Sequence, residues 1–210
     1  MITFIHVGKC GGTTLRSLFA TNKIRYNHIH CRPCKYQKND KYLLAIRNPV
    51  DRFVSAFYWR KYLLENKKQR NKNELKFFKK YKTIDILCEA LYEENGDLNL
   101  DIDKSISSPV RRHPSHLGMG LDYYIGDFMK EYNKETIIDI VCTETLDHDL
   151  QKIFGLKLET HKNNNKKNKQ GFSEESRQIL KKYLHKDYYV VEKLNDLNLL
   201  SNEQYKILKK

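Results

Sequence analysis

Short apolar runs alternate with stretches of helical spacing near the start of the chain. Ile2–Val7 and Tyr42–Ile46 are almost continuously hydrophobic, as expected for strands covered on both faces of a sheet. Thr13–Ala20 follows the first run with apolar residues at helical spacing, and Arg25–Cys31 alternates like a short strand. Another helical pattern follows the second run at once. This succession predicts an α/β fold of P-loop-like type, with three layers and a central parallel sheet flanked by helices.

Charge and hydrophobic spacing predict the elements in the rest of the chain. Residues 61–82 are basic with helical spacing, residues 89–103 are acidic with a turn expected at Asn95-Gly96, and residues 104–116 predict a loop. The further expected elements are an amphipathic helix over Leu117–Tyr132, a strand over Ile137–Cys142, a helix over Leu146–Phe154 and a helix capped by Ser173. The low-complexity stretch His161–Gly171 predicts a mobile loop.

Length and composition narrow the class of protein. The 210 residues predict one domain, residues 1–210, and 40% hydrophobic residues are enough for a core. The net charge of +13 fits a polyanionic partner, although lysine runs are also typical of solvated faces. Five cysteines without disulfide spacing, no signal peptide and no apolar window long enough to span a bilayer predict a soluble, cytoplasmic protein.

The segment FIHVGKCGGTTL, Phe4–Leu15, has the order strand, glycine turn, helix. Glycines let a backbone approach a ligand closely, and the N–H groups at a helix N-terminus bind anions. The predicted anion-binding set is Gly8, Lys9, Cys10, Gly11, Gly12, Thr13 and Thr14. The alternative is a plain strand-to-helix turn with a surface lysine. The patterns GxxxxGK[ST] and GxGxxG are both absent, which argues against ATP and NAD.

A second candidate site lies in AIRNPVDRFVSAFYW, Ala45–Trp59. Arg47 follows the second buried run directly, at the strand end where open α/β sheets place ligands. Asn48 suits a helix N-cap, and Pro49 suits the first helical position. Helical spacing then lets Arg47 and Ser55 reach the same ligand side, and a guanidinium with a hydroxyl suits a phosphate monoester. The alternative is that Arg47 and Arg52 only pair with nearby acids.

Together these two segments resemble the PAPS-dependent sulfotransferases, above all the carbohydrate and heparan 2-O enzymes. The family has a 5′-phosphosulfate loop after its first strand, here HVGKCGGTTL, and a 3′-phosphate motif R-(D/N)-P-x-x-R-x-x-S, here RNPVDRFVS. The resemblance implies that the glycine-loop set holds the phosphosulfate of PAPS, while Arg47 and Ser55 hold the 3′-phosphate. It also implies PAP as the product and an acceptor with a hydroxyl group, for which a glycan is the first candidate.

Sulfuryl transfer needs a cation at the leaving group and a base for the acceptor proton. Lys9 is the candidate for the leaving group. His28 and His30 alternate on one strand and therefore face one side of the sheet, and the heparan 2-O enzymes carry a His-x-His in a similar place. His113 and His116, in the loop RRHPSHLGMG, are the competing pair. The third interpretation gives none of these histidines a chemical role.

The run H-x-H-C-x-x-C around Cys31 and Cys34 has three interpretations. A metal site is disfavoured, because four ligands within seven residues seldom close a tetrahedron and no second motif accompanies them. A redox pair or a local disulfide is the second, and two structural thiols are the third. Cys10 similarly fits a thiol of lowered pKa or, preferably, a structural thiol. No metal ligand is assigned, because lysine, arginine and backbone N–H groups supply the positive charge.

Three other functions fit parts of the pattern. A small-molecule or nucleotide kinase predicts ATP and Mg²⁺ binding and a lysine placed after the glycines. A basic nucleic-acid-binding protein without catalysis predicts steeply salt-dependent binding, but no recognisable nucleic-acid module is present. A sulfotransferase fold that has lost its cofactor is the third. The sequence favours the PAPS-dependent enzyme and predicts no specific nucleic acid as a partner.

Overall fold

The computed structural model describes most of the chain. The described residues are 1–38, 40–66, 72–107, 116–133, 136–157 and 171–210. The expected mobile loop over residues 161–171 falls almost entirely outside them, as does His113. No helix among the described residues is both long enough and apolar enough to cross a membrane.

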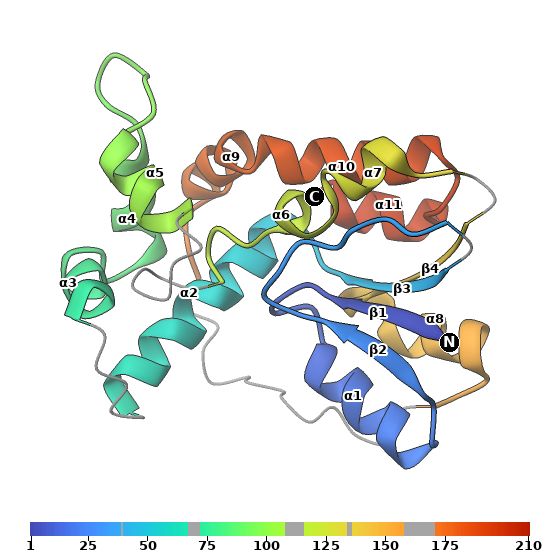
Figure 1. Ribbon diagram of the computed structural model, residues 1–210. Coiled ribbons are helices and arrows are strands. Elements are labelled where there is room, and N and C mark those ends of the chain that lie inside the picture. Colours follow the sequence, from blue (N-terminus) through green and yellow to red (C-terminus); the bar gives the residue numbers. More distant parts are fainter. Residues whose placement is uncertain (39, 67–71, 108–115, 134–135, 158–170) are drawn as a thin grey trace.

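The centre of the molecule is a four-stranded parallel sheet (Figure 1). Its strands are β1 (Ile2–His6), β2 (Tyr26–Ile29), β3 (Lys41–Ile46) and β4 (Ile137–Cys142), in the order β2-β1-β3-β4. An α/β fold with a parallel sheet is therefore confirmed. Because all four strands run the same way, their carboxyl ends and the residues that follow them meet at one edge.

Helices lie on both sides of this sheet (Figure 1). On one side are α1 (Gly12–Thr21) and α8 (Leu146–Phe154), and on the other are α6 (Leu121–Ile125), α7 (Phe128–Glu131), α10 (His185–Asp196) and α11 (Asn202–Leu208). The short 3-10 helix η1 (Thr143–Thr145) joins β4 to α8. The buried strands and these helices share one hydrophobic cluster, which contains the apolar residues of β1, β3 and β4.

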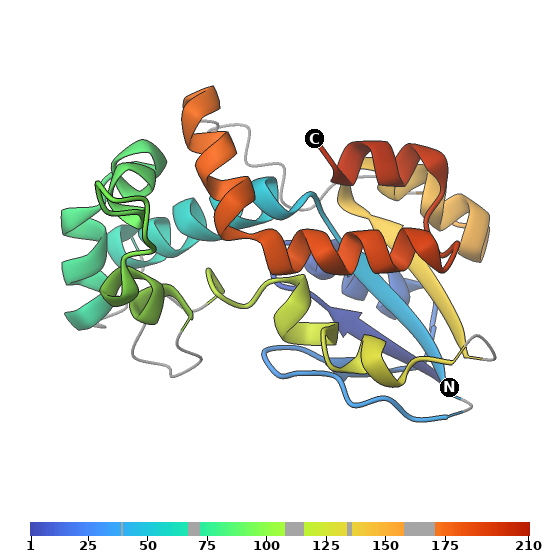
Figure 2. The ribbon, with the colours of Figure 1, turned by 90° about the horizontal axis from the view of Figure 1, so that it is seen from above.

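A second group of helices extends away from the sheet (Figure 2). It consists of the long α2 (Pro49–Asn66) with α3 (Lys72–Lys80), α4 (Ile84–Leu91), α5 (Leu100–Ser107) and α9 (Glu174–Tyr183). This helical half has its own apolar cluster, in which Phe53, Phe57 and Leu87 are fully buried. The expected apolar stripe on the helix after Arg47 is confirmed and faces this cluster. The prediction of a single domain over residues 1–210 stays a prediction.

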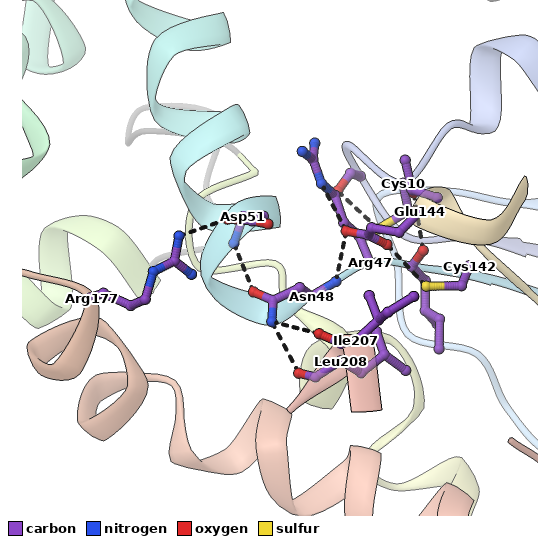
Figure 3. Close-up of polar contacts among 12 residues, drawn as sticks. Cys10, Arg47, Asn48, Asp51, Cys142, Glu144, Arg177, Ile207 and Leu208 are labelled. Atoms are coloured by element: carbon purple, nitrogen blue, oxygen red, sulfur yellow. Dashed lines mark hydrogen bonds and ion pairs between the residues drawn. The ribbon is translucent and has the colours of Figure 1, made fainter. Parts of the chain in front are cut away.

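Helix starts follow local side chains, as the sequence predicts. Asn48 accepts a hydrogen bond from the Asp51 N–H at 3.1 Å, so α2 begins at Pro49 with a capped first turn. Asn48 also donates to the carbonyl of Leu208 at 3.1 Å, which joins the start of α2 to the end of α11 (Figure 3). The hydroxyl of Ser173 caps α9 by accepting from the Ser176 N–H at 3.0 Å.

Three expected elements differ in the structure. The helix predicted over Leu117–Tyr132 is instead two short helices, α6 and α7. Glycines stand before and between them, and glycine is a poor helix former. A Cβ on Gly120 would lie 2.0 Å from the carboxylate of Asp187, and one on Gly126 would lie 2.4 Å from that of Asp122. Parts of the basic stretch 61–82 lie in α2 and α3, and the first four residues of the loop predicted over 104–116 are helical, since α5 continues to Ser107.

Candidate functional site

The glycine loop joins the carboxyl end of β1 to the first turn of α1. Lys9 and Gly11 both have left-handed backbone angles, with φ of 72° and 73°. Gly12 lies directly against the ring of His6, and a Cβ there would come within 2.0 Å of the imidazole. The paired glycines are therefore required by the turn at position 11 and by close packing at position 12. Lys9 has no such freedom, so its backbone conformation is strained.

The N-terminus of α1 is open at this loop. No side chain among the described residues caps it, and the hydroxyl of Thr13 is exposed whereas Thr14 is buried. Backbone N–H groups at an uncapped helix start carry partial positive charge and can donate hydrogen bonds to a bound anion. Cys10 lies beneath the loop and is buried, and burial raises its pKa to about 12. The interpretation of Cys10 as a thiol of lowered pKa is therefore wrong, because the site is too dry for a thiolate.

Lys9 lies partly buried between the loop and α2. Its ammonium is 4.4 Å from the centre of the Trp59 ring, a distance typical of a cation–π contact. Burial, and secondly the charge of Arg47, lower the pKa of Lys9 to about 8. The second effect shows that Lys9 lies within electrostatic range of Arg47, so the two predicted cations lie at the same edge of the sheet.

Strand pairing accounts for this meeting. Ile46 is the last residue of β3 and pairs with Cys142 at the end of β4, while His6 of β1 pairs with Ala45. Arg47 therefore leaves the sheet beside the glycine loop on one side and beside the residues after β4 on the other. Neighbouring ends of parallel strands thus bring both sequence motifs to one place.

Glu144 is the counter-charge of Arg47. Its carboxylate lies 3.5 Å from Arg47 Nε and accepts hydrogen bonds from the Asn48 N–H at 3.4 Å and the Cys142 thiol at 2.9 Å (Figure 3). Within the described residues, the terminal Nη groups of Arg47 make no hydrogen bond. The interpretation that Arg47 pairs with an acid is correct for Nε, and the Nη groups remain available to a ligand.

The two arginines of the second motif have different roles. Arg52 is buried, and its Nη groups donate to the carbonyls of His116 at 2.7 Å and Leu117 at 2.6 Å. The interpretation of Arg52 as a partner of nearby acids is therefore wrong. Asp51 pairs instead with Arg177 at 3.4 Å. Arg52 holds the returning chain at residues 116–119 against the start of α2.

Ser55 lies on the side of α2 that faces the loop. It precedes Trp59 by four residues, so the two side chains share a helix face, and the Trp59 ring contacts Lys9. Ser55 is half-buried. Ser55 lies one helical turn nearer the sheet than Trp59. This position is compatible with the predicted role of Ser55 beside Arg47.

A row of four histidines continues from the loop across the sheet edge. The rings of His6 and His30 stack with centroids 4.1 Å apart, and His30 stacks with His116 at 5.5 Å. His28 stacks with His30 at 5.7 Å, which confirms that these two side chains face one side of the sheet. Its Nε2 also lies 3.2 Å from Nδ1 of His6. The structure thus unites His30 with His116, which the sequence treated as competitors.

The protonation of this row follows from its contacts. Burial, followed by the neighbouring histidines, lowers the pKa of His6 to about 3 and that of His116 to about 4, so both rings are neutral near pH 7. His30 Nδ1 lies 2.9 Å from the carbonyl oxygen of His6 and must donate to it, since a carbonyl only accepts. In the neutral ring of His30 the proton is therefore on Nδ1, and Nε2 carries a free lone pair.

Sequence reasoning missed three residues of this site. His6 has no signal of its own, because its importance comes from pairing across the sheet with the segment of His28 and His30. Trp59 looks like another apolar residue of a helix. Glu144 could have been found, since it follows a predicted buried strand by two residues and such positions meet at the ligand edge.

No protein-family model, curated protein or solved structure matches this chain.

Proposed function

We propose that the protein is a PAPS-dependent sulfotransferase of P-loop-like, three-layer architecture. It transfers the sulfuryl group to a hydroxyl, and a carbohydrate is the first candidate for the acceptor. The observation that carries the proposal is the meeting of Lys9 and Arg47. They follow adjacent parallel strands, lie close enough for the charge of Arg47 to lower the pKa of Lys9, and flank an uncapped helix N-terminus.

Two separate cations suit a ligand with two separate anionic groups. The loop after β1 combines Lys9 with the N–H groups of α1, an arrangement that binds a phosphate or phosphosulfate. Arg47, directly after the neighbouring strand, has Nη groups that make no hydrogen bond to the described residues, and Ser55 lies on the adjacent face of α2. A nucleotide phosphorylated at both 5′ and 3′ positions engages both, whereas a simple 5′ nucleotide engages only the first.

Glu144 constrains the proposal because it places a negative charge beside Arg47. The carboxylate contacts only the Nε side of the guanidinium and is held there by Asn48 and Cys142. It therefore orients the guanidinium and leaves its terminal donors for a second anion, as a fixed carboxylate does for a functional arginine. Glu144 is a positioning residue in this proposal.

In the reaction, an acceptor oxygen forms a bond to sulfur as the bond from sulfur to the 5′-phosphate oxygen of PAPS breaks. The electron pair of the broken bond stays on PAP, where Lys9 and the N–H groups of α1 stabilise the added charge. The hydroxyl proton passes to His30 Nε2 and then to solvent. The products are PAP, the sulfate ester and one proton, so that charge and atoms balance.

His30 is the base in this proposal because its tautomer is already set. The carbonyl of His6 holds the proton on Nδ1, and Nε2 is free to accept another. His116 and His28 flank it. Burial is the largest cause that lowers the pKa of both rings, which favours their neutral forms. They line the same edge and position the acceptor, in keeping with the predicted set.

Calorimetry with PAP, ATP and a random oligonucleotide tests the proposal. We expect PAP to bind, and Lys9→Ala and Arg47→Ala each to weaken it about 10- to 150-fold, as the loss of a charged hydrogen bond of about 1.5–3 kcal/mol requires. His30→Ala should keep PAP affinity but lose transfer of labelled sulfate to a glycan mixture.

Matched controls separate site effects from general charge. Lys130→Ala and Arg25→Ala remove the same side chains from exposed positions away from the loop and should leave PAP affinity unchanged. ATP binding that exceeds PAP binding would favour the kinase, and binding of the oligonucleotide alone would favour the nucleic-acid-binding protein. Full turnover in His30→Ala would transfer the role of base to His116 or His28.

A further inference from the structure

Three potential metal ligands converge at the end of the histidine row. One ligand atom each of His30, Cys31 and His116 lies within 4.8 Å of the others. His30 and Cys31 follow β2, whereas His116 comes from a segment more than eighty residues later. The objection that one short motif cannot close a tetrahedron therefore does not apply to this set, because its ligands come from two elements.

The ligand chemistry selects a borderline-soft dication. Imidazole and thiolate are both ligands of Zn²⁺, and copper takes the same two imidazoles and one thiolate. Three protein ligands leave a fourth position open. Bonds of about 2.0–2.3 Å put tetrahedral ligand atoms about 3.3–3.8 Å apart, so the three groups need to approach by about 1 Å. Cys31 is exposed on a turn, which gives its thiol room to make that movement.

Each ligand is supported by contacts behind it. The Nδ1–H of His30 donates to the His6 carbonyl at 2.9 Å, and this second contact is typical of a histidine that coordinates a metal through Nε2. The backbone N–H of Cys31 donates to the Tyr124 hydroxyl at 3.2 Å. The carbonyl of His116 accepts from the buried Arg52 at 2.7 Å.

Two of the ligands have strained backbones. Cys31 has φ of 57° and His116 has φ of 78°, a region that costs a residue other than glycine about 1–3 kcal/mol. The Nδ1 of His116 is also buried without a hydrogen-bond partner among the described residues. Backbone strain that surrounding contacts enforce is frequent at functional positions.

The other cysteine of the Cys-x-x-Cys pair is not part of the cluster. Cys34 is buried, its backbone N–H donates to the Tyr124 carbonyl at 2.8 Å, and its thiol lies 3.6 Å from the carbonyl of Lys35. Both thiols are free. Cys34 is therefore a natural control for any effect assigned to Cys31.

We infer that His30, Cys31 and His116 form a binding site for Zn²⁺ or a similar thiophilic dication, with its fourth position open to solvent. The thiol of Cys31 loses its proton to solvent on binding. That negative charge is needed because the positive charges of Arg60, Arg52 and Lys9 act on His116 and oppose a further cation.

The site has a regulatory consequence, which rests on the proposed function. A metal bound to Nε2 of His30 occupies the lone pair that would accept the acceptor proton. Zn²⁺ therefore inhibits sulfuryl transfer, and a chelator restores it. PAP binding does not use this lone pair and should persist in the presence of the metal.

Cobalt spectroscopy on the full chain without nucleotide tests the metal site directly. Titration with Co²⁺ should produce a thiolate-to-cobalt charge-transfer band, which Zn²⁺ then abolishes by displacement. Cys31→Ser should lose the band, and His116→Ala should weaken Co²⁺ binding at least about tenfold. Cys34→Ser and His148→Ala, an exposed histidine on α8, should retain both.

Two outcomes would overturn the inference. One is the absence of a charge-transfer band in the unaltered chain at millimolar Co²⁺. The other is a band that survives Cys31→Ser, particularly if Cys34→Ser removes it. Circular dichroism of each variant shows that the fold is intact. This readout needs neither PAPS nor turnover, so the metal site and the sulfotransferase proposal can fail separately.

Discussion

The edge of the sheet and the helical half of this protein are built in opposite ways. At the sheet edge, the buried positions include His6 and the guanidinium of Arg52, and the half-buried ones are Lys9 and the other three histidines of the row. In the helical half, the interior contains aromatic and aliphatic side chains from α2, α3, α4, α5 and α9. Away from the start of α2, where Arg52 turns to the sheet edge, a buried charge of this half is Glu74, which accepts a hydrogen bond from Arg60 Nε at 3.0 Å.

Backbone strain separates the two regions in the same way. Five described residues other than glycine have a left-handed backbone, and three of them, Lys9, Cys31 and His116, lie at the sheet edge. None lies in α2, α3, α4, α5 or α9 or in the described residues between α2 and α5. Strain of this kind persists only where surrounding contacts enforce it. The comparison indicates that the helical half supplies stability and that the sheet edge uses part of it.

The largest expected effect is a loss of stability from a substitution in the helical half that leaves the site intact. Phe57 is fully buried, and Phe57→Ala should lower the free energy of unfolding by about 3–5 kcal/mol, because a large cavity replaces the ring. Urea titration measures the loss. PAP affinity of the folded fraction should stay within about threefold, since the ring packs in the helical cluster, against Phe78.

A milder substitution keeps this test decisive if the alanine variant does not fold. Phe57→Leu leaves a smaller cavity and should give a smaller loss of stability with the same PAP affinity. A tenfold loss of PAP affinity in a folded Phe57→Leu protein would show that the two regions are not separable.

The second effect acts on the sheet edge. Gly12→Ala places a Cβ within 2.0 Å of the His6 ring, so the loop and the histidine row must both shift. We expect a loss of about 1–3 kcal/mol of stability and a fall in PAP affinity of at least about tenfold. Gly171→Ala, where a Cβ meets no atom within 4 Å, is the matched control for a change of this kind. Unchanged PAP binding in Gly12→Ala would remove the loop from the proposed site.

The smallest effect is a dependence of PAP affinity on pH. The pKa of Lys9 is about 8 in the free protein, so Lys9 loses its charge as the pH rises through this value. Affinity should be constant near pH 7 and fall by up to about tenfold per pH unit above pH 8. Cys10, whose pKa burial raises to about 12, stays neutral over this range.

Lys9→Arg sharpens this measurement because arginine keeps its charge over the whole range. Its PAP affinity, measured by calorimetry at pH 7 and pH 9.5, should be nearly flat. Proton uptake on PAP binding near pH 9 should be seen in the unaltered chain only. An affinity of the unaltered chain that does not change up to pH 9.5 would show that Lys9 does not contact the anion.

The sequence by itself determined the α/β class, the four strands and the starts of the helices after Asn48 and Ser173. These features are local, since continuous apolar runs, glycines and capping side chains act within a few residues. The positions of Lys9 and Arg47 at strand ends follow from the same patterns. Their meeting could be expected once both strands were assigned to one parallel sheet.

Only the tertiary structure decided which distant side chains share a surface. Register places His6 against the segment of His30, the end of β4 brings Glu144 to Arg47, and the buried Arg52 draws His116 to the loop. Each contact joins residues at least twenty-four positions apart, and no periodicity along the chain encodes such pairs. Strand order and side-chain packing select them, because both depend on the free energy of the whole folded molecule.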